Sequence, residues 1–252
     1  MKSILTKIEF HYTYIIIALG FVLTGYFYNL LAFTTIILVH ELGHIFMFFM
    51  YKVEIKKIII YPYGGNIKIS SKVNRDINED LLIAIMGIVF QTFFYSIIVI
   101  LFKSNIISNY IYNLYTMYHY SILIFNLLPL YPLDGFKILN LLLSKILPFK
   151  LSLYITISIS FICIILLLFF KLNYSYIMII SLFINNTYIY FKNVKYIYNK
   201  FILERYLYEF NYKKKVIINN INKMYKNKKH IFKLGKTLYS EKSYLNKRML
   251  KK

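Results

Sequence analysis

The sequence predicts an all-α polytopic membrane protein with six transmembrane helices and a short β-hairpin at the membrane surface after the second helix. The chain has 252 residues, of which 59% are hydrophobic and only 16% are charged, whereas a soluble protein carries about 25% charged residues. Six apolar runs each approach the roughly 20 residues that a helix needs to cross the hydrocarbon core. Composition and run length therefore both exclude an ordinary soluble domain.

The six predicted spans can be tested against the distribution of positive charge. We place them at about residues 12–26, 28–51, 81–102, 110–128, 151–170 and 174–191. With the N-terminus in the cytoplasm, all of the 31 Lys and Arg residues except Lys103 and Lys171 fall in cytoplasmic segments. Positive residues concentrate on the cytoplasmic side of membrane proteins. The charge pattern thus supports six spans with both termini in the cytoplasm.

The hairpin is predicted between the second and third spans. Residues 53–61 and 66–70 are β-branched and partly alternating, and Pro62, Gly64 and Gly65 separate them, as is typical of two strands joined by a turn. One interpretation is a simple interfacial loop. The other is that a free strand edge binds an extended substrate by strand addition, which makes Gly64 and Gly65 candidate substrate-binding residues.

The second span carries the pentapeptide His40-Glu41-Leu42-Gly43-His44 within an otherwise apolar run. Residues four apart lie on one face of a helix, one turn from each other. Two histidines so placed can bind one zinc ion, and the glutamate between them can act as the general base on the attacking water. His40 and His44 are therefore candidate metal ligands, and Glu41 is the candidate catalytic base.

The fourth span ends in a broken segment that supplies a further candidate ligand. Pro129 and Pro132 cannot continue a regular helix, and broken backbone at membrane depth is tolerated only where it is buried in protein or lines a cavity. Asp134 follows these prolines. Because intramembrane carboxylates are costly and usually functional, we predict Asp134 as the third zinc ligand; the alternative is that it caps the next helix. Asn126 either binds substrate backbone or satisfies broken helix carbonyls.

Three further polar residues in or beside the spans have no assigned role. Gln91 in the third span is predicted to form an interhelical hydrogen bond. His119 in the fourth span is predicted to be a satisfied interior histidine, and His11 an interfacial residue. None of the three is included among the catalytic or metal-binding candidates.

The composition changes after the sixth span, which predicts two regions. Residues 1–192 would form the six-span metalloprotease domain, and residues 193–252 a basic cytoplasmic tail. This tail holds 17 of the 31 Lys and Arg residues and shows no clear alternating strand pattern. A basic segment beside an anionic leaflet predicts contact with membrane lipid. No nucleic-acid-binding motif accompanies the charge, so nucleic acid is not an expected partner.

The histidine motif, together with residues 126–135 and their Leu133-Asp134-Gly135 core, resembles the paired signatures of the site-2 protease family of zinc intramembrane metalloproteases. Six spans, and an apolar strand followed by Pro62-Tyr63-Gly64-Gly65, resemble its stage IV sporulation branch. The sequence departs from the family where a Gly-Pro-x-x-Asn pattern is common in the third span, because Ile88 follows Gly87 and Gln91 stands at the Asn position.

The resemblance implies one zinc ion per chain, held by His40, His44 and Asp134, with Glu41 as the base. It also implies intramembrane cleavage of a membrane-associated precursor, here a sporulation pro-sigma factor, under the control of regulatory membrane proteins. The implied location is a Gram-positive bacterial membrane, for the sporulation branch the membrane that surrounds the forespore. That branch usually ends in a nucleotide-sensing CBS domain, of which residues 193–252 would be a shortened, degenerate version.

Two rival functions remain open at this point. A membrane-anchored zinc protease of the Ste24 or heat-shock type would act in protein quality control, but such enzymes use a downstream glutamate as third ligand, and none here lies in a matching helical pattern. A non-enzymatic membrane scaffold or transporter is opposed by the intact base and ligand set, and by the lack of the internal repeats common in transporters.

Overall fold

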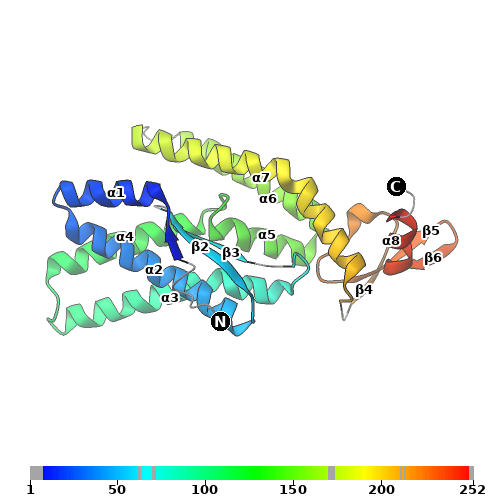
Figure 1. Cartoon of the computed structure of the whole chain (residues 1–252), viewed down its shortest axis with the longest axis horizontal. Helices are drawn as coiled ribbons and strands as arrows, with labels where there is room; N and C mark the ends of the chain where they lie inside the picture. The colour runs from blue at the N-terminus through cyan, green and yellow to red at the C-terminus, as the bar shows by residue number, and fades with distance from the viewer. Residues whose placement is uncertain are drawn as a thin grey trace. The chain divides into compact units, whose positions relative to one another are not determined.

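The computed structural model describes residues 8–61, 64–69, 72–169, 174–210, 212 and 214–249. It is mostly helical, with two small sheets. Pro62, Tyr63, Ser70, Phe170 and Lys171, which the sequence predictions used, lie outside the described residues. The described helices are α1 (Tyr12–Leu23), α2 (Phe27–Met50), α3 (Ile77–Lys103), α4 (Asn109–Leu127), α5 (Asp134–Ile146), α6 (Phe149–Leu168), α7 (Tyr174–Leu207) and α8 (Glu241–Met249) (Figure 1).

The described strands form two three-stranded sheets, each with one parallel and one antiparallel pair. Their bounds are β1 (Ile8–Phe10), β2 (Ile55–Tyr61), β3 (Gly64–Ile69), β4 (Lys215–Ile218), β5 (Lys229–Leu234) and β6 (Thr237–Ser240). The first sheet has the order β1-β2-β3 and the second β4-β5-β6. The all-α class predicted from the sequence is therefore too narrow, because short strands accompany the helices.

Each predicted span coincides with a helix. Among the described residues, three helices are long and apolar enough to cross a membrane: α2, α3 and α6, with α1 as a shorter apolar helix. Exposed apolar side chains cover these helices, for example Phe93 on α3, which is 69% exposed. Burying such surface against lipid is favourable, so these helices suit a bilayer. A crossing by α1, α4 and α7 stays a prediction.

The chain divides into two compact units, of which the first comprises Met1–Ser71 and Leu82–Asn126. In this unit β2 pairs parallel with β1 and antiparallel with β3. Ile58 of β2 is almost fully buried in a cluster with Met47 and Phe48 of α2. The sheet is therefore held against the helix that carries the histidine motif.

Helices α2 and α3 approach each other closely at two glycines. A Cβ atom on Gly43 would lie 2.3 Å from the carbonyl oxygen of Met86 and 2.9 Å from the Cα of Gly87. Real Cβ contacts do not become this short, so only glycine fits at position 43. Small residues allow the backbones of membrane helices to meet, and here they bring α3 directly onto the motif face of α2.

The second unit comprises Lys72–Leu81 and Leu127–Lys252. Its core contains Phe136 of α5, Leu153 of α6, Phe201 of α7 and Phe232 of β5. Helices α6 and α7 run side by side, and the second sheet with α8 follows the end of α7 (Figure 1). Helix α7 is continuous across residue 192, so the boundary predicted there lies inside a helix.

Residues 193–252 show no clear alternating strand pattern in the sequence, yet β4, β5 and β6 lie in this segment. The strands contain only four to six residues, so their alternation is weak in the sequence. They are stabilised by packing against a helix, because Phe232 of β5 stacks on Tyr244 of α8 with ring centroids 3.8 Å apart.

Arg205, at the end of α7, connects this small sheet to the segment that precedes α3. Its Nε donates to Asn74 Oδ1 at 2.7 Å, and its Nη1 to Glu241 Oε1 at 3.2 Å. It also donates to the backbone carbonyls of Lys228, Tyr225 and Lys226. A buried guanidinium is stabilised only when its donors are satisfied, so these bonds fix the sheet, α7 and the connecting segment as one unit.

Candidate metal centre

The two histidines of the motif converge on the face of α2 that packs against α3. His40 and His44 are both almost fully buried, and their Nε2 atoms are 3.1 Å apart. Two ligands of a tetrahedral zinc ion, each bound at about 2.0–2.1 Å, would be separated by roughly 3.3 Å. The separation of the two nitrogens therefore fits a shared metal ion.

The second nitrogen of each ring fixes its tautomer. His44 Nδ1 lies 2.7 Å from the backbone carbonyl oxygen of Ile83. Because a carbonyl can only accept, Nδ1 must carry the proton, which leaves the Nε2 lone pair for a metal. His40 Nδ1 lies 3.1 Å from Oε1 of Gln91, which has the same effect. Neutral imidazoles with Nε2 unprotonated are the form that binds zinc.

Gly87 provides the space in front of the two rings. A Cβ atom at this position would lie 2.5 Å from His44 Nε2 and 2.8 Å from His40 Nε2. The absence of a side chain thus leaves both nitrogens room for an ion. Gly87 is four residues before Gln91, so both residues occupy the same face of α3.

Glu41 is also almost fully buried, and it is held by the sheet. Its Oε1 accepts a hydrogen bond of 2.7 Å from the backbone N–H of Gly65 in β3. A Cβ on Gly65 would lie 2.3 Å from Cδ of Glu41, so the glycine is needed for this approach. Gly64 adopts φ +136°, a conformation that only glycine adopts readily. The two predicted glycines therefore bring β3 to the carboxylate.

Asp134 is the first residue of α5 and is buried. Its Oδ1 accepts a hydrogen bond of 2.8 Å from Lys137 Nζ. A Cβ on the adjacent Gly135 would lie 2.3 Å from the carbonyl oxygen of Leu127, so the start of α5 packs tightly on the end of α4. This close packing fixes the backbone that carries Asp134.

His40 and His44 belong to the first unit, whereas Asp134 belongs to the second. Two imidazole nitrogens are ligands that suit zinc, so the histidine pair of the first unit can bind a metal ion. Asp134 as the third ligand stays a prediction.

The other predicted residues have the following places. Asn126 is buried one residue before the end of α4. His11 caps α1, and its Nδ1 lies 2.8 Å from Thr13 Oγ1. The sequence places Gly87 and Gln91 at positions of the Gly-Pro-x-x-Asn pattern in the third span, but it predicts neither residue beside the motif histidines. The signal that could have found them is their spacing of four residues on a helix that must pack against the motif.

Comparisons with known proteins first show a likeness to a family of peptidases. Residues 28–113 match the model of Peptidase family M50, and the fold resembles the solved site-2 protease from Methanocaldococcus jannaschii. That match has a TM-score of 0.52 and 24% sequence identity, and covers 81% of this chain and 93% of the other. Part of the chain is therefore similar to Peptidase family M50, and the likeness to the solved structure concerns the fold.

Two curated relatives make the likeness more particular. The chain is 37% identical over 149 residues to stage IV sporulation protein FB of Bacillus subtilis (strain 168), which covers 59% of this chain and 51% of that protein. It is 32% identical over 191 residues to the zinc metalloprotease MJ0392 of Methanocaldococcus jannaschii, covering 70% and 55%. The chain spans about half the length of these relatives. The matches confirm the resemblance to zinc metalloproteases, and the geometry of the two histidines suits a zinc ion.

Proposed function

We propose that this protein is a zinc-dependent intramembrane endopeptidase that hydrolyses a peptide bond in a membrane-associated protein precursor. The observation that carries the proposal is the buried His40-Glu41-x-x-His44 group. The Nδ1 atom of each imidazole faces a hydrogen-bond acceptor, and the glutamate between the histidines is held separately by β3. In this proposal His40, His44 and Asp134 hold one zinc ion, and Glu41 is the base.

Glu41 would perform the proton transfers of hydrolysis. Its carboxylate takes a proton from the attacking water as the water oxygen bonds to the peptide carbonyl carbon, and returns it to the amine as the C–N bond breaks. Zinc, when bound, would polarise the peptide carbonyl and increase the acidity of water. The hydrogen bond from Gly65 N–H keeps one carboxylate oxygen in place during these steps.

Among the described strands β3 lies at the edge of its sheet, and this edge is the surface that would bind the substrate. Gly65 pairs with Ile60 of β2 but donates its N–H to Glu41, so this N–H points away from β2. Backbone groups alternate along a strand with a period of two, so the N–H of Ile67 points to the same edge. A peptide added to this edge would lie extended beside Glu41, which supports Gly64 and Gly65 as substrate-binding residues. Asn126 is retained as a candidate for binding substrate backbone.

We further propose a sporulation pro-sigma factor as the substrate and the membrane surrounding the forespore as the location, with both termini of the chain in the cytoplasm. The support is the likeness to stage IV sporulation protein FB, whose name places it in sporulation. Regulatory membrane proteins would restrain the enzyme, and residues 193–252 would contact membrane lipid.

The test uses the purified full-length chain in lipid vesicles with two substrates, a membrane-inserted pro-sigma precursor and an unfolded soluble protein. Cleavage of the precursor at one site, with the soluble protein left intact, is the expected result. Broad degradation of the soluble protein would favour the quality-control class instead, and cleavage of neither would contradict the proposed activity.

A further inference from the structure

A chain of buried polar groups extends from the histidine motif into α3 and α4, and the hydrolytic mechanism does not use it. Gln91 is fully buried and His119 is nearly so. Oε1 of Gln91 lies 3.1 Å from Nδ1 of His40, while its Nε2 donates to the backbone oxygen of His119 at 2.9 Å. All three residues belong to the first unit.

The backbone oxygen of His119 determines how the Gln91 amide is oriented. A carbonyl oxygen can only accept a hydrogen bond, so the amide nitrogen of Gln91 must face α4. The amide oxygen must then face His40, where it can only accept. His40 Nδ1 therefore carries the proton, and its Nε2 keeps the lone pair that a metal needs.

His119 supports this arrangement in a second way. Its Nδ1 lies 3.4 Å from the amide nitrogen of Gln91, and its ring stacks on Tyr95 with centroids 4.2 Å apart and an interplanar angle of 5°. Tyr95 in turn lies 3.2 Å from Thr116 Oγ1 through its hydroxyl. The Gln91 amide is thus held by α4 on one side and reaches His40 on the other.

We infer that Gln91 is a positioning residue that fixes the tautomer and ring plane of His40 for metal binding, and that the His119 backbone anchors it. The inference rests on the proposed zinc enzyme. A simple interhelical hydrogen bond between α3 and α4 would account for the Nε2 contacts alone. It would not account for the position of the amide oxygen, which lies beside Nδ1 of His40. The other nitrogen of this ring, Nε2, faces His44.

The test measures zinc affinity of the full-length protein in detergent by competition with a chelator of known affinity. Gln91→Met keeps the volume of the side chain but removes the acceptor, and we expect zinc affinity to fall about 10- to 100-fold, as it does when the partner of a ligating histidine is removed. Thr92→Val is the matched control on the same helix, because Thr92 is exposed and bonds to its own helix at Ile88. It should bind zinc like the wild type.

Gln91→Glu distinguishes positioning from packing. The carboxylate restores an acceptor for His40 Nδ1, so we expect zinc affinity to return to within about threefold of the wild type, since carboxylate partners of ligating histidines support metal binding. In cobalt-substituted protein, the d–d absorption of Gln91→Met should shift while that of Gln91→Glu should not. His119→Phe keeps the backbone oxygen and should weaken zinc binding less than Gln91→Met does.

Equal zinc affinity in the wild type and Gln91→Met would overturn the inference, as would a Gln91→Glu protein that binds zinc as weakly as Gln91→Met. If Gln91→Met does not fold, the zinc affinity of Gln91→Glu is compared with that of the wild type. An affinity within about threefold supports the inference, and a fall of about tenfold or more overturns it. These outcomes are separable from failure of the proposed function. A wild type that binds zinc but cleaves no precursor would contradict the protease and leave the role of Gln91 standing.

Discussion

At the scale of residues, the centre depends on positions where a side chain is absent as much as on the ligands. Gly43 lets α2 and α3 meet, Gly87 leaves space before the two imidazoles, and Gly65 lets β3 reach Glu41. His40, His44 and Glu41 could be named from the sequence as candidate ligands and base because their spacing alone implies this chemistry. The glycines could not, because their role depends on which backbone faces them.

Gly87→Ala should therefore impair metal binding without altering any ligand. The added methyl group would lie within 3 Å of both Nε2 atoms, so the rings must shift, and we expect zinc affinity to fall about tenfold or more. Gly20→Ala on α1 is the matched control, since its Cβ would meet nothing within 4 Å. Chelator competition measures both variants, and a Gly87→Ala protein with wild-type affinity would show that the space in front of the imidazoles is not needed.

At the scale of elements, six apolar runs predicted six helices because each run is long and continuous enough to indicate a helix by its length and composition. The strands were harder to predict. β1 pairs with β2, whose residues lie about 50 positions further along the chain, and the last three strands depend on α8 and Arg205. Such stabilisation by distant partners leaves little signal within a short window of sequence.

The edge of β3 gives a prediction for substrate binding. Ile67→Pro removes one N–H from the free edge while leaving the hydrogen bonds to β2, since proline is tolerated on edge strands. Losing a hydrogen bond worth about 1 kcal/mol should raise KM roughly five- to tenfold. Ile67→Ala keeps the N–H and controls for the lost side chain. Steady-state cleavage should show the larger KM only for Ile67→Pro, with zinc content unchanged; equal KM values would count against strand addition.

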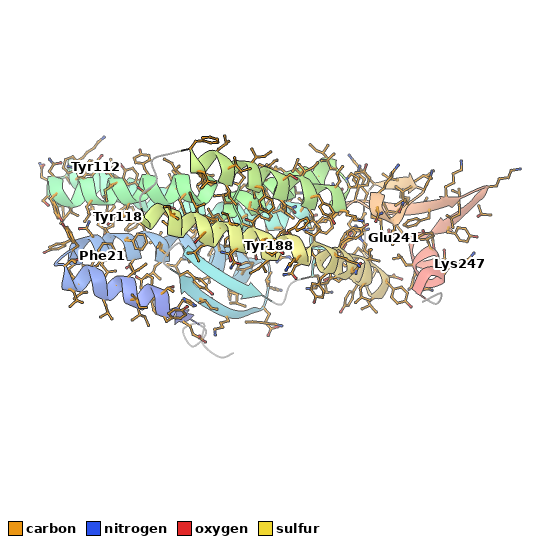
Figure 2. The ribbon with its side chains drawn as sticks, turned by 90° about the horizontal axis from the view of Figure 1, so that it is seen from above. Phe21, Tyr112, Tyr118, Tyr188, Glu241 and Lys247 are labelled. Carbon is orange, nitrogen blue, oxygen red and sulfur yellow. The ribbon has the colours of Figure 1, made fainter. Side chains whose placement is uncertain are left out.

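The small sheet at the C-terminal end gives a prediction for pH. Burial lowers the pKa of His230 below its ordinary value, and neighbouring Arg205 and Lys228 act in the same direction against Glu241. Burial raises the pKa of Glu241, but its hydrogen bond with His230 and the charge of Arg205 outweigh this and lower it overall. Glu241 lies at the start of α8 (Figure 2).

Both lowered pKa values make the folded segment less stable as the pH falls, because the unfolded segment then binds more protons than the folded one. The contribution of His230 is complete above its unfolded pKa of about 6.5 and is lost as pH falls toward the lowered folded value; that of Glu241 is lost below about pH 4.3. Amide-exchange protection of β4 to β6 should fall from pH 7 to pH 5.5 in the wild type and not in His230→Gln. An equal loss of amide-exchange protection in the wild type and in His230→Gln would show that His230 does not cause this pH dependence.

At the scale of the whole molecule, a mostly helical membrane chain supports one chemical centre. Apolar helices and the charge asymmetry favour a membrane environment for it. The histidine helix carries two of the proposed ligands and the proposed base, and Asp134 is proposed as the third ligand. The chain is similar to its curated relatives over about half their length. The proposed intramembrane proteolysis requires that zinc binding and proton transfer reside in different residues.

Separating these two roles is the most direct test. Zinc content and precursor cleavage are measured together in the wild type, Glu41→Gln and Asp134→Asn. We expect Glu41→Gln to keep zinc at one ion per chain yet lose cleavage by about 10²-fold or more, because it removes the general base. Asp134→Asn should lose both zinc and cleavage. Undiminished cleavage by Glu41→Gln, or full zinc content in Asp134→Asn at limiting zinc, would contradict the assignment of base and ligand.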